Sequence, residues 1–148
     1  MLDKLTKRKN HNPLYGSRIY RCWSSMKDRC NNSNSNSFDR YGGRGISYTR
    51  RWEKFAGFFA DMAMTYKDNL TLDRIDNNKG YSKKNCRWVT HKQNCNNKGN
   101  NTLITINGMT QTITQWAEEI GITPQTVHKR IKRGWSIERA ITTKNLKK

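Results

Sequence analysis

The chain has 148 residues, a length that suits one domain or two small ones. Its 29 Lys and Arg residues exceed its 11 Asp and Glu residues, so the formal net charge is +18. The sequence contains no run of about 18 apolar residues, which excludes a helix that spans a membrane. A chain of this charge repels itself unless a polyanion neutralises it, and nucleic acid is the partner that we expect, because each neutralised phosphate releases counterions. An anionic membrane surface is the less favoured alternative.

Two features bear on the compartment. Residues 1–15 are polar and basic, predict a flexible arm, and lack the apolar segment of a signal peptide. Four cysteines are present, with no CxxC pair and with separations that are unlike a zinc knuckle: Cys22, Cys30, Cys86 and Cys95. We therefore expect a cytoplasmic protein with reduced, mostly buried thiols. A structural zinc ion is the less favoured alternative.

The first part of the folded chain predicts two helices joined by a glycine-rich segment. Apolar residues recur at helical spacing in 16–30, and an Asn- and Ser-rich loop follows them. The glycines after this loop predict a tight turn or a close backbone approach, and 46–49 predict a short strand. A second helix is predicted at 51–64, although Gly57 weakens it.

Residues 70–98 predict a strand, a turn-rich loop, a second strand and a short helix, in this order. Asp73 ends the first strand, and Asn94 lies in the helix. In such a unit the carboxylate faces the first turn of the helix, and carboxylate and amide oxygens are hard ligands that suit Mg²⁺ or Mn²⁺. Asn85 is predicted to tie the loop down through its side-chain amide. The alternative is ordinary turn chemistry, in which Asp73 caps the loop and Asp76 stabilises the following turn.

This segment resembles the HNH, or ββα-metal (His-Me finger), endonuclease family. The resemblance rests on Asp73, Asn85 and Asn94, and on the stretch NCRWVTHKQN, which is similar to the second strand and helix of phage HNH homing endonucleases. It covers roughly residues 70–101, about a quarter of the chain. It implies a metal-dependent nuclease in which these three residues belong to the catalytic site, with Asp73 and Asn94 as the protein ligands of the metal.

Arg74 departs from the family pattern, in which the residue after the first metal ligand is usually the histidine that activates water. Arginine stays protonated and is a poor base. We therefore predict that Arg74 clamps the scissile phosphate through two donors. As the base we favour His91, three residues before Asn94, over Tyr41 beside the glycines. A metal-bound hydroxide with no side-chain base is the third option.

The surroundings of Asp73 are basic, since no acidic residue occurs between Asp76 and Glu118. Basic residues here and near the first glycines are predicted to contact the DNA backbone. A solvated basic surface is the alternative for any one of them. The predicted contacts are Arg44, Arg50, Arg51, Lys83, Lys84, Arg87 and Lys92.

Residues 102–148 predict a separate module. The Asn-Gly pair at 107–108 indicates a hairpin turn. Two helices follow, with Gly121 in the turn, Thr123 as N-cap and Pro124 as the first residue of the second helix. The pattern resembles a helix-turn-helix, whose second helix enters the major groove, and small modules appended to phage homing nucleases. An αα-hairpin with a solvated basic face is the alternative. The exposed candidates for DNA contact are Gln125, Thr126, His128, Lys129, Arg130, Lys132 and Arg133.

These features together predict an α+β fold. The ββα-metal (HNH) core and a preceding helical and short-strand region occupy 16–101, and the β-hairpin plus helix-turn-helix occupies 102–148. We expect a Mg²⁺-dependent HNH endonuclease for double-stranded DNA, of the free-standing homing type, in the host cytoplasm if a phage encodes it. A monomer has one cutting centre and is expected to nick one strand, whereas double-strand cleavage needs a homodimer or sequential nicks. The alternatives are a non-catalytic DNA-binding regulator on a degenerate HNH scaffold and an HNH restriction endonuclease.

Overall fold

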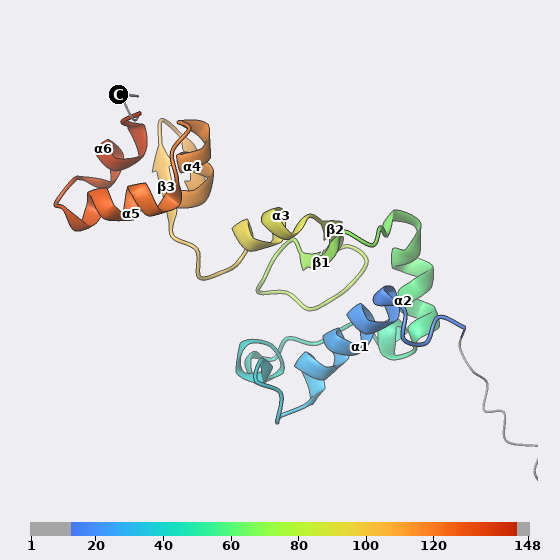
Figure 1. The fold of residues 1–148 in the computed structure, drawn as a ribbon. Coiled ribbons are helices and arrows are strands. Elements are labelled where there is room, and N and C mark those ends of the chain that lie inside the picture. The colour runs from blue at the N-terminus through green and yellow to red at the C-terminus, as the bar shows by residue number, and fades with distance from the viewer. Residues whose placement is uncertain (1–12, 145–148) are drawn as a thin grey trace, which may run out of the picture. The chain divides into compact units, whose positions relative to one another are not determined.

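The computed structural model describes residues 13–144, which form an α+β fold with two small antiparallel sheets (Figure 1). Most of the predicted basic arm lies outside these residues. The chain divides into two compact units, Met1–His91 and Lys92–Lys148. The division falls earlier than the predicted boundary near residue 101, because residues 92–96 make side-chain contacts within the second unit. Within the described range, no helix is both long and apolar enough to cross a bilayer.

The first unit combines helices, short 3₁₀ turns and one two-stranded sheet. In chain order these elements are α1 (Arg18–Asn31), η1 (Phe38–Arg40), η2 (Gly42–Arg44), η3 (Arg50–Glu53), α2 (Phe55–Met62), η4 (Ala63–Thr65), β1 (Thr71–Arg74) and β2 (Cys86–Val89). The first predicted helix is confirmed, and Ser17 caps it by accepting from the Tyr20 N–H. The predicted short strand is reduced to one parallel bridge between Tyr48 and Tyr81.

The predicted continuous helix over 51–64 is wrong, because the backbone becomes extended at Lys54 and separates η3 from α2. Tertiary packing explains the break. Trp52 is fully buried, and a Cβ atom on Gly57 would lie 1.9 Å from the Arg51 carbonyl oxygen. Gly57 therefore serves the close packing of η3 on α2, and this packing outweighs the helical periodicity of the sequence.

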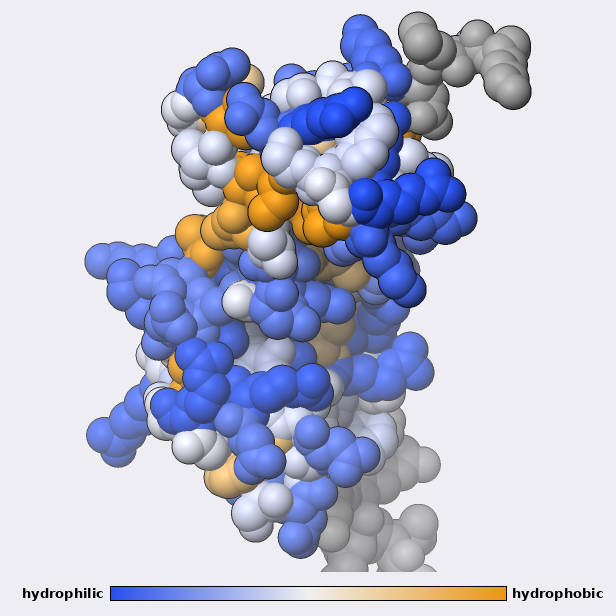
Figure 2. Space-filling view, turned by 90° about the vertical axis from the view of Figure 1, so that its left-hand side faces the viewer, coloured by the Kyte–Doolittle hydropathy of each residue, from blue (hydrophilic) through white to orange (hydrophobic). Residues whose placement is uncertain are grey.

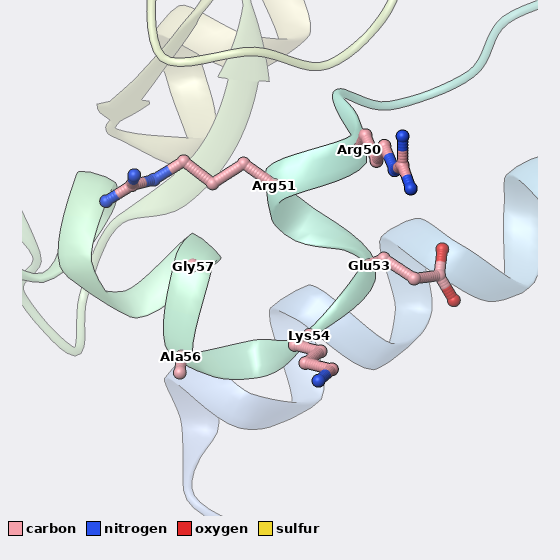
Figure 3. A pocket seen from close by; sticks show the side chains of 6 residues that line it. All are labelled: Arg50, Arg51, Glu53, Lys54, Ala56 and Gly57. Carbon is pink, nitrogen blue, oxygen red and sulfur yellow. The ribbon is translucent and has the colours of Figure 1, made fainter.

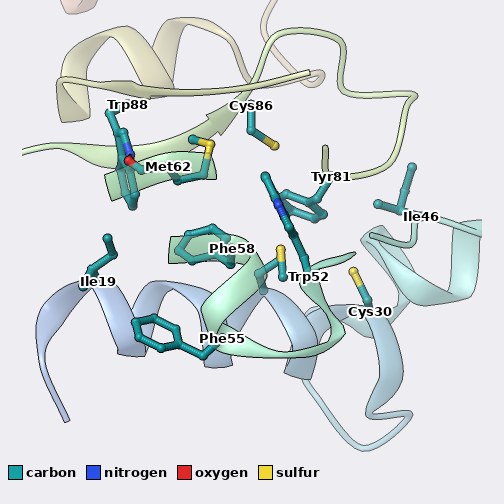
Figure 4. Close-up of a cluster of buried hydrophobic side chains, with 11 residues drawn as sticks. Ile19, Cys30, Ile46, Trp52, Phe55, Phe58, Met62, Tyr81, Cys86 and Trp88 are labelled. Carbon is teal, nitrogen blue, oxygen red and sulfur yellow. The ribbon is translucent and has the colours of Figure 1, made fainter. Parts of the chain in front are cut away.

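Aromatic side chains fill the core of the first unit, between the two helices and one face of the sheet (Figure 4). Trp52 and Phe58 are fully buried, and their rings meet edge to face at 5.0 Å. The indole of Trp88 donates to the Met62 carbonyl at 2.7 Å, which ties β2 to the end of α2. The sheet is therefore held on the helices by apolar packing together with the hydrogen bond of the Trp88 indole.

The second unit contains α3 from its second residue, a β-hairpin and three helices. These elements are α3 (His91–Asn96), β3 (Leu103–Ile106), β4 (Met109–Thr112), α4 (Ile113–Glu119), α5 (Pro124–Lys132) and α6 (Ile137–Thr142). The predicted hairpin is confirmed, with Asn107 at φ 50° and Gly108 at φ 78°. Gly121 has φ 72° and Thr123 accepts from the Thr126 N–H, as predicted. Helix α6, capped by Ser136, was not predicted.

The second unit has its own small core, in which the fully buried side chains come from α4, α5 and α6: Ala117, Val127, Ala140 and Ile141. Thr112 and Gln115 form a capping box at the start of α4, which fixes the step from hairpin to helix. Hydrophilic side chains cover most of the face of the molecule drawn in Figure 2, in keeping with an apolar content of only 33%.

Candidate active site and nucleic-acid interface

The β1–β2 sheet divides the candidate residues between two faces. Cross-strand pairing sets Asp73 opposite Arg87, and Arg74 opposite Cys86. Successive side chains in a strand point to opposite faces, so Asp73 and Arg87 share one face while Arg74 and Cys86 share the other. Cys86 belongs to the aromatic core, which identifies its face as the core face. We call the other face, with Asp73 and Arg87, the outer face.

Asp73 is a buried carboxylate with a basic partner on the outer face. The residue is only 4% exposed. Its Oδ2 accepts from the Nε of Arg87 at 3.0 Å, and the Arg87 side chain is 48% exposed. A charge-assisted hydrogen bond of this kind orients both partners. The arrangement leaves a solvent-accessible guanidinium beside a carboxylate that is held in a fixed direction.

Arg74 lies on the core face, and this placement contradicts its predicted role as a phosphate clamp. The residue is 6% exposed, and its guanidinium lies 4.9 Å from the ring centre of Tyr41 and 4.8 Å from that of Tyr81. It also donates to the Lys79 carbonyl at 3.2 Å. The pleat of β1 turns Arg74 away from the face that carries Asp73, so in this structure Arg74 binds rings and backbone.

Tyr41 belongs to the same core-face stack, so its placement does not support the predicted role as the base. Its ring stacks on Tyr81 with centres 6.3 Å apart, and the guanidinium of Arg29 lies 4.8 Å from the Tyr41 ring centre. Burial raises the pKa of the Tyr81 hydroxyl well above its usual range. The two rings and the two guanidinium groups of Arg29 and Arg74 form a cation–π stack that joins α1 to β1.

Asn85 makes the bracing contacts that the sequence predicted. Its side-chain amide donates to the carbonyls of Asp76 at 3.1 Å and Gly80 at 2.9 Å. Its Oδ1 accepts from the Asp76 N–H at 2.9 Å. The carboxylate of Asp76 accepts from the Asn78 N–H, and this bond, with the ammonium of Lys79, lowers the pKa of Asp76. The loop between the strands is therefore cross-braced.

The predicted residues of α3 lie at the boundary of the units. His91 is the first residue of the helix and is exposed. Asn94 is half-buried and belongs to the second unit, so its predicted pairing with Asp73 stays a prediction. All four cysteines carry free thiols, and two of them, Cys30 and Cys86, are buried. Within residues 13–144 no group of three or more His, Cys, Asp or Glu side chains lies close enough to hold a metal ion.

Several predicted backbone contacts in the first unit are exposed cations. Lys83 has a side chain that is 70% exposed, and Lys84 is also exposed. Arg44 donates to Asn78 at 2.9 Å, so it already has a partner in the loop. Arg50 and Arg51 leave η3 in different directions and line one shallow hollow of about 510 Å³ (Figure 3). All five side chains are exposed on the first unit, and Arg51 and Lys83 both pair with Asp61.

In the second unit, α5 exposes most of the predicted contacts. The exposed side chains are Gln125, His128, Lys129, Lys132 and Arg133, while Thr126 is half-buried. Lys92 is exposed but forms an ion pair with Glu118 at 2.8 Å. The predicted exposure of Arg130 is wrong. It is 8% exposed, donates to the Ala140 carbonyl at 2.9 Å, and lies over the ring of Trp135. Its guanidinium thus donates hydrogen bonds to backbone carbonyls at the C-terminal end of α6.

Sequence reasoning missed Asp61 and Arg29. Asp61 lies in α2 and contacts three side chains, and Arg29 lies in the last turn of α1 and joins the cation–π stack. Both partner sets come from distant segments, so local spacing carries no signal for them. Comparison of the chain with family models, curated proteins and solved structures finds no match. The resemblance of residues 70–101 to HNH nucleases therefore rests on the sequence pattern alone, with no support from a related protein.

Proposed function

We propose that this chain is a Mg²⁺-dependent HNH endonuclease that hydrolyses phosphodiester bonds of double-stranded DNA. The observation that carries the proposal is the outer face of the β1–β2 sheet. There Asp73 is buried, oriented by Arg87, and followed by a loop that Asn85 braces. A net charge of +18 supplies the attraction to a polyanion.

The donor chemistry of Asp73 fits the implied ion. Mg²⁺ binds through one or two carboxylates and keeps several ligand positions for water and substrate phosphate. Asp73 supplies one such carboxylate, and the family resemblance assigns Asn94 as the second ligand. When bound, Mg²⁺ stabilises the charge that develops on the scissile phosphate. This mode of binding needs no cluster of three acidic, imidazole or thiol groups, and residues 13–144 contain none.

Arg87 takes over the role that Arg74 does not fill. It shares the outer face with Asp73, its Nε binds the carboxylate, and nearly half of its side chain is exposed. A guanidinium has a second pair of donors that a phosphate accepts. Arg87 thus orients Asp73 and holds a phosphodiester oxygen beside it. His91 remains the base that we favour, because it is an exposed imidazole at the start of α3.

The second unit recognises the target site on the DNA. Helix α5 follows a short turn after α4 and exposes Gln125 and Lys129, and Arg133 is exposed at its C-cap; these side chains suit base edges and phosphates. Its buried side, with Val127 and Arg130, holds it on α4 and α6. This division between a buried and a basic exposed side supports a helix that enters the major groove.

The proposal is tested with supercoiled plasmid DNA incubated with the purified chain in Mg²⁺ or in EDTA. We expect Mg²⁺-dependent nicking, which Asp73→Ala and Asp73→Asn abolish while DNA binding is retained. His91→Ala is expected to slow nicking by about 10²-fold if it is the base. Arg87→Lys, which keeps the charge but not the planar fork, is expected to slow nicking more than Arg44→Lys does.

A non-catalytic DNA-binding regulator is the second candidate. The observation that favours it is the burial of Arg74 at the position where the family usually has its base. Binding that persists without any nicking in Mg²⁺ or Mn²⁺, across several DNA sequences, decides for the regulator and against the nuclease.

A further inference from the structure

We propose that Arg51 and Lys83 form a binding site for one phosphodiester group of the DNA backbone, and that Asp61 is its positioning residue. The inference rests on the proposed binding of DNA and does not depend on whether the chain cuts it. It assigns the two cations, which come from distant segments, to a single phosphate. It also gives a role to a carboxylate that the proposed chemistry does not use.

Asp61 brings the two cations together. Its Oδ2 lies 3.3 Å from the Nε of Arg51, and its Oδ1 lies 3.9 Å from the Nζ of Lys83. Arg51 comes from η3 and Lys83 from the loop before β2, so 32 positions of sequence separate them. Both cations therefore converge on opposite oxygens of a single carboxylate. A phosphodiester also carries two charged oxygens on one atom, and such a group can accept from both cations.

The carboxylate itself is fixed in place. The Asp61 side chain is only 12% exposed, and its Oδ2 accepts from the indole N–H of the fully buried Trp52 at 2.8 Å. Gly57 lets η3 approach α2, since a Cβ atom there would lie 1.9 Å from the Arg51 carbonyl oxygen. The backbone beneath Arg51 is thereby held against the helix that carries Asp61. The carboxylate to which the two exposed cations bind is therefore pre-formed, which lowers the cost of ordering them.

The charged ends of the pair remain open to a ligand. The side chains of Arg51 and Lys83 are 63% and 70% exposed. Among residues 13–144, the ion pair of Arg51 uses Nε, which leaves the forked end of the guanidinium for a phosphate. Arg50 and Lys54 also line the hollow, as Figure 3 shows, but their side chains leave the backbone away from that of Arg51, and the carboxylate of Glu53 lies between them. The anion that matches this surface is a backbone phosphate.

The experiment measures binding of a labelled duplex of about 20 base pairs at several salt concentrations, in EDTA so that no cutting occurs. The variants are Arg51→Ala, Lys83→Ala and the double variant, with Lys67→Ala as the control for removal of one exposed cation. Each single variant is expected to lower affinity about threefold to tenfold and to reduce the salt slope by about 1, more than the control does. Both side chains are exposed, so we expect these variants to fold like the native chain, which their tryptophan fluorescence checks.

Cooperation within one site sets the expected result for the double variant. If both cations hold the same phosphate, removing the second after the first has little further effect, and the losses do not multiply. Asp61→Asn keeps an acceptor for the Trp52 indole but loses the charge that binds Arg51 and Lys83. In that background we expect the two losses to become smaller and to multiply. This coupling is unaffected by the general gain of positive charge on removing Asp61.

Each outcome decides a separate statement. Losses no larger than that of Lys67→Ala, or losses that multiply in the native chain, overturn the shared phosphate site. Coupling that is unchanged by Asp61→Asn, in a variant whose tryptophan fluorescence shows the native fold, overturns the positioning role of Asp61. A native chain that binds duplex DNA with no salt dependence overturns this inference together with the proposed function. If the native chain's affinity for DNA falls steeply with salt, but the Arg51 and Lys83 variants bind as tightly as the native chain, this inference is overturned and the proposed function is not.

Discussion

Asp73 and Arg74 are neighbours in β1, yet their side chains serve opposite faces of the same sheet. Asp73 is paired with Arg87 on the outer face, and Arg74 is stacked on the core face against Tyr41 and Tyr81. The two adjacent charges are both buried, and each is satisfied by different elements. The position that the proposed HNH resemblance aligns with the family's base thus supports the sheet in this chain.

This arrangement predicts that Arg74→Ala mainly lowers stability. The substitution removes the guanidinium from two aromatic rings, deletes the hydrogen bond to the Lys79 carbonyl, and leaves a space in the core. We expect the free energy of unfolding to fall by about 2–4 kcal/mol, measured by urea denaturation. Arg74→Lys is expected to lose less, because the ammonium keeps the charge near the rings.

The matched control is Arg44→Ala, because Arg44 is exposed and its hydrogen bond to Asn78 lies on the surface of the same loop. Its loss is expected to cost about 1 kcal/mol or less. If Arg74→Ala leaves the unfolding free energy unchanged and abolishes plasmid nicking, the stacking role is wrong and the phosphate clamp regains support.

The brace of the loop predicts a local effect of Asn85→Asp. Aspartate keeps an acceptor for the Asp76 N–H but has no donor for the carbonyls of Asp76 and Gly80. We expect faster hydrogen exchange of the loop amides between the strands, with core amides such as that of Trp88 unaffected. Equal acceleration throughout the first unit would mean that Asn85 supports the fold globally and does not brace one loop.

The order of elements in 70–98 and the hairpin at 103–112 were predictable because their signals are local. Alternation and turn residues predict the strands and loop of 70–98, and the Asn-Gly pair at 107–108 predicts the hairpin turn. The caps at Thr123 and Ser17 are of the same kind, since each bonds an N–H three residues ahead.

The burial of particular arginines was not predictable, because it depends on contacts between distant segments. Arg74 and Arg130 read as exposed cations in the sequence, yet aromatic rings and helix carbonyls from elsewhere bury both. The break at Lys54 has the same origin, since the burial of Trp52 and the approach allowed by Gly57 act through tertiary packing. The resemblance singled out Asp73 and Arg74 together, but the pleat of the strand places their side chains on opposite faces.

Two adjacent residues of α5 offer a test of that distinction. Lys129 is exposed and Arg130 is buried against α6 and Trp135. Lys129→Ala is expected to leave thermal stability unchanged and to reduce the salt slope of DNA binding by about 1. Arg130→Ala is expected to destabilise the second unit by about 2–3 kcal/mol, because carbonyls at the end of α6 lose their donor. Unaltered stability in Arg130→Ala, with weaker DNA binding, would return Arg130 to the contact surface.

The last prediction concerns alkaline pH. Burial raises the pKa of the Cys86 thiol from its ordinary 9.0 to about 11. Between these pH values the thiol of the unfolded chain loses its proton while that of the folded chain keeps it. This deprotonation lowers the free energy of the unfolded state only, so the folded state becomes relatively less stable. The stability that Cys86 contributes is therefore fully present below about pH 9 and is lost as pH rises toward about 11. The loss amounts to about 2–3 kcal/mol for a shift of this size.

Cys86→Ala removes the titrating group while keeping a small apolar side chain in the core. We expect this variant to be less stable than the native chain at about pH 8, and to lose less stability between about pH 9 and about pH 11. Urea denaturation under a reducing agent at several pH values measures both quantities. The raised pKa of Tyr81 acts in the same direction at higher pH, so Tyr81→Phe isolates its share. Identical pH slopes for Cys86→Ala and the native chain would show that the buried thiol does not govern alkaline stability.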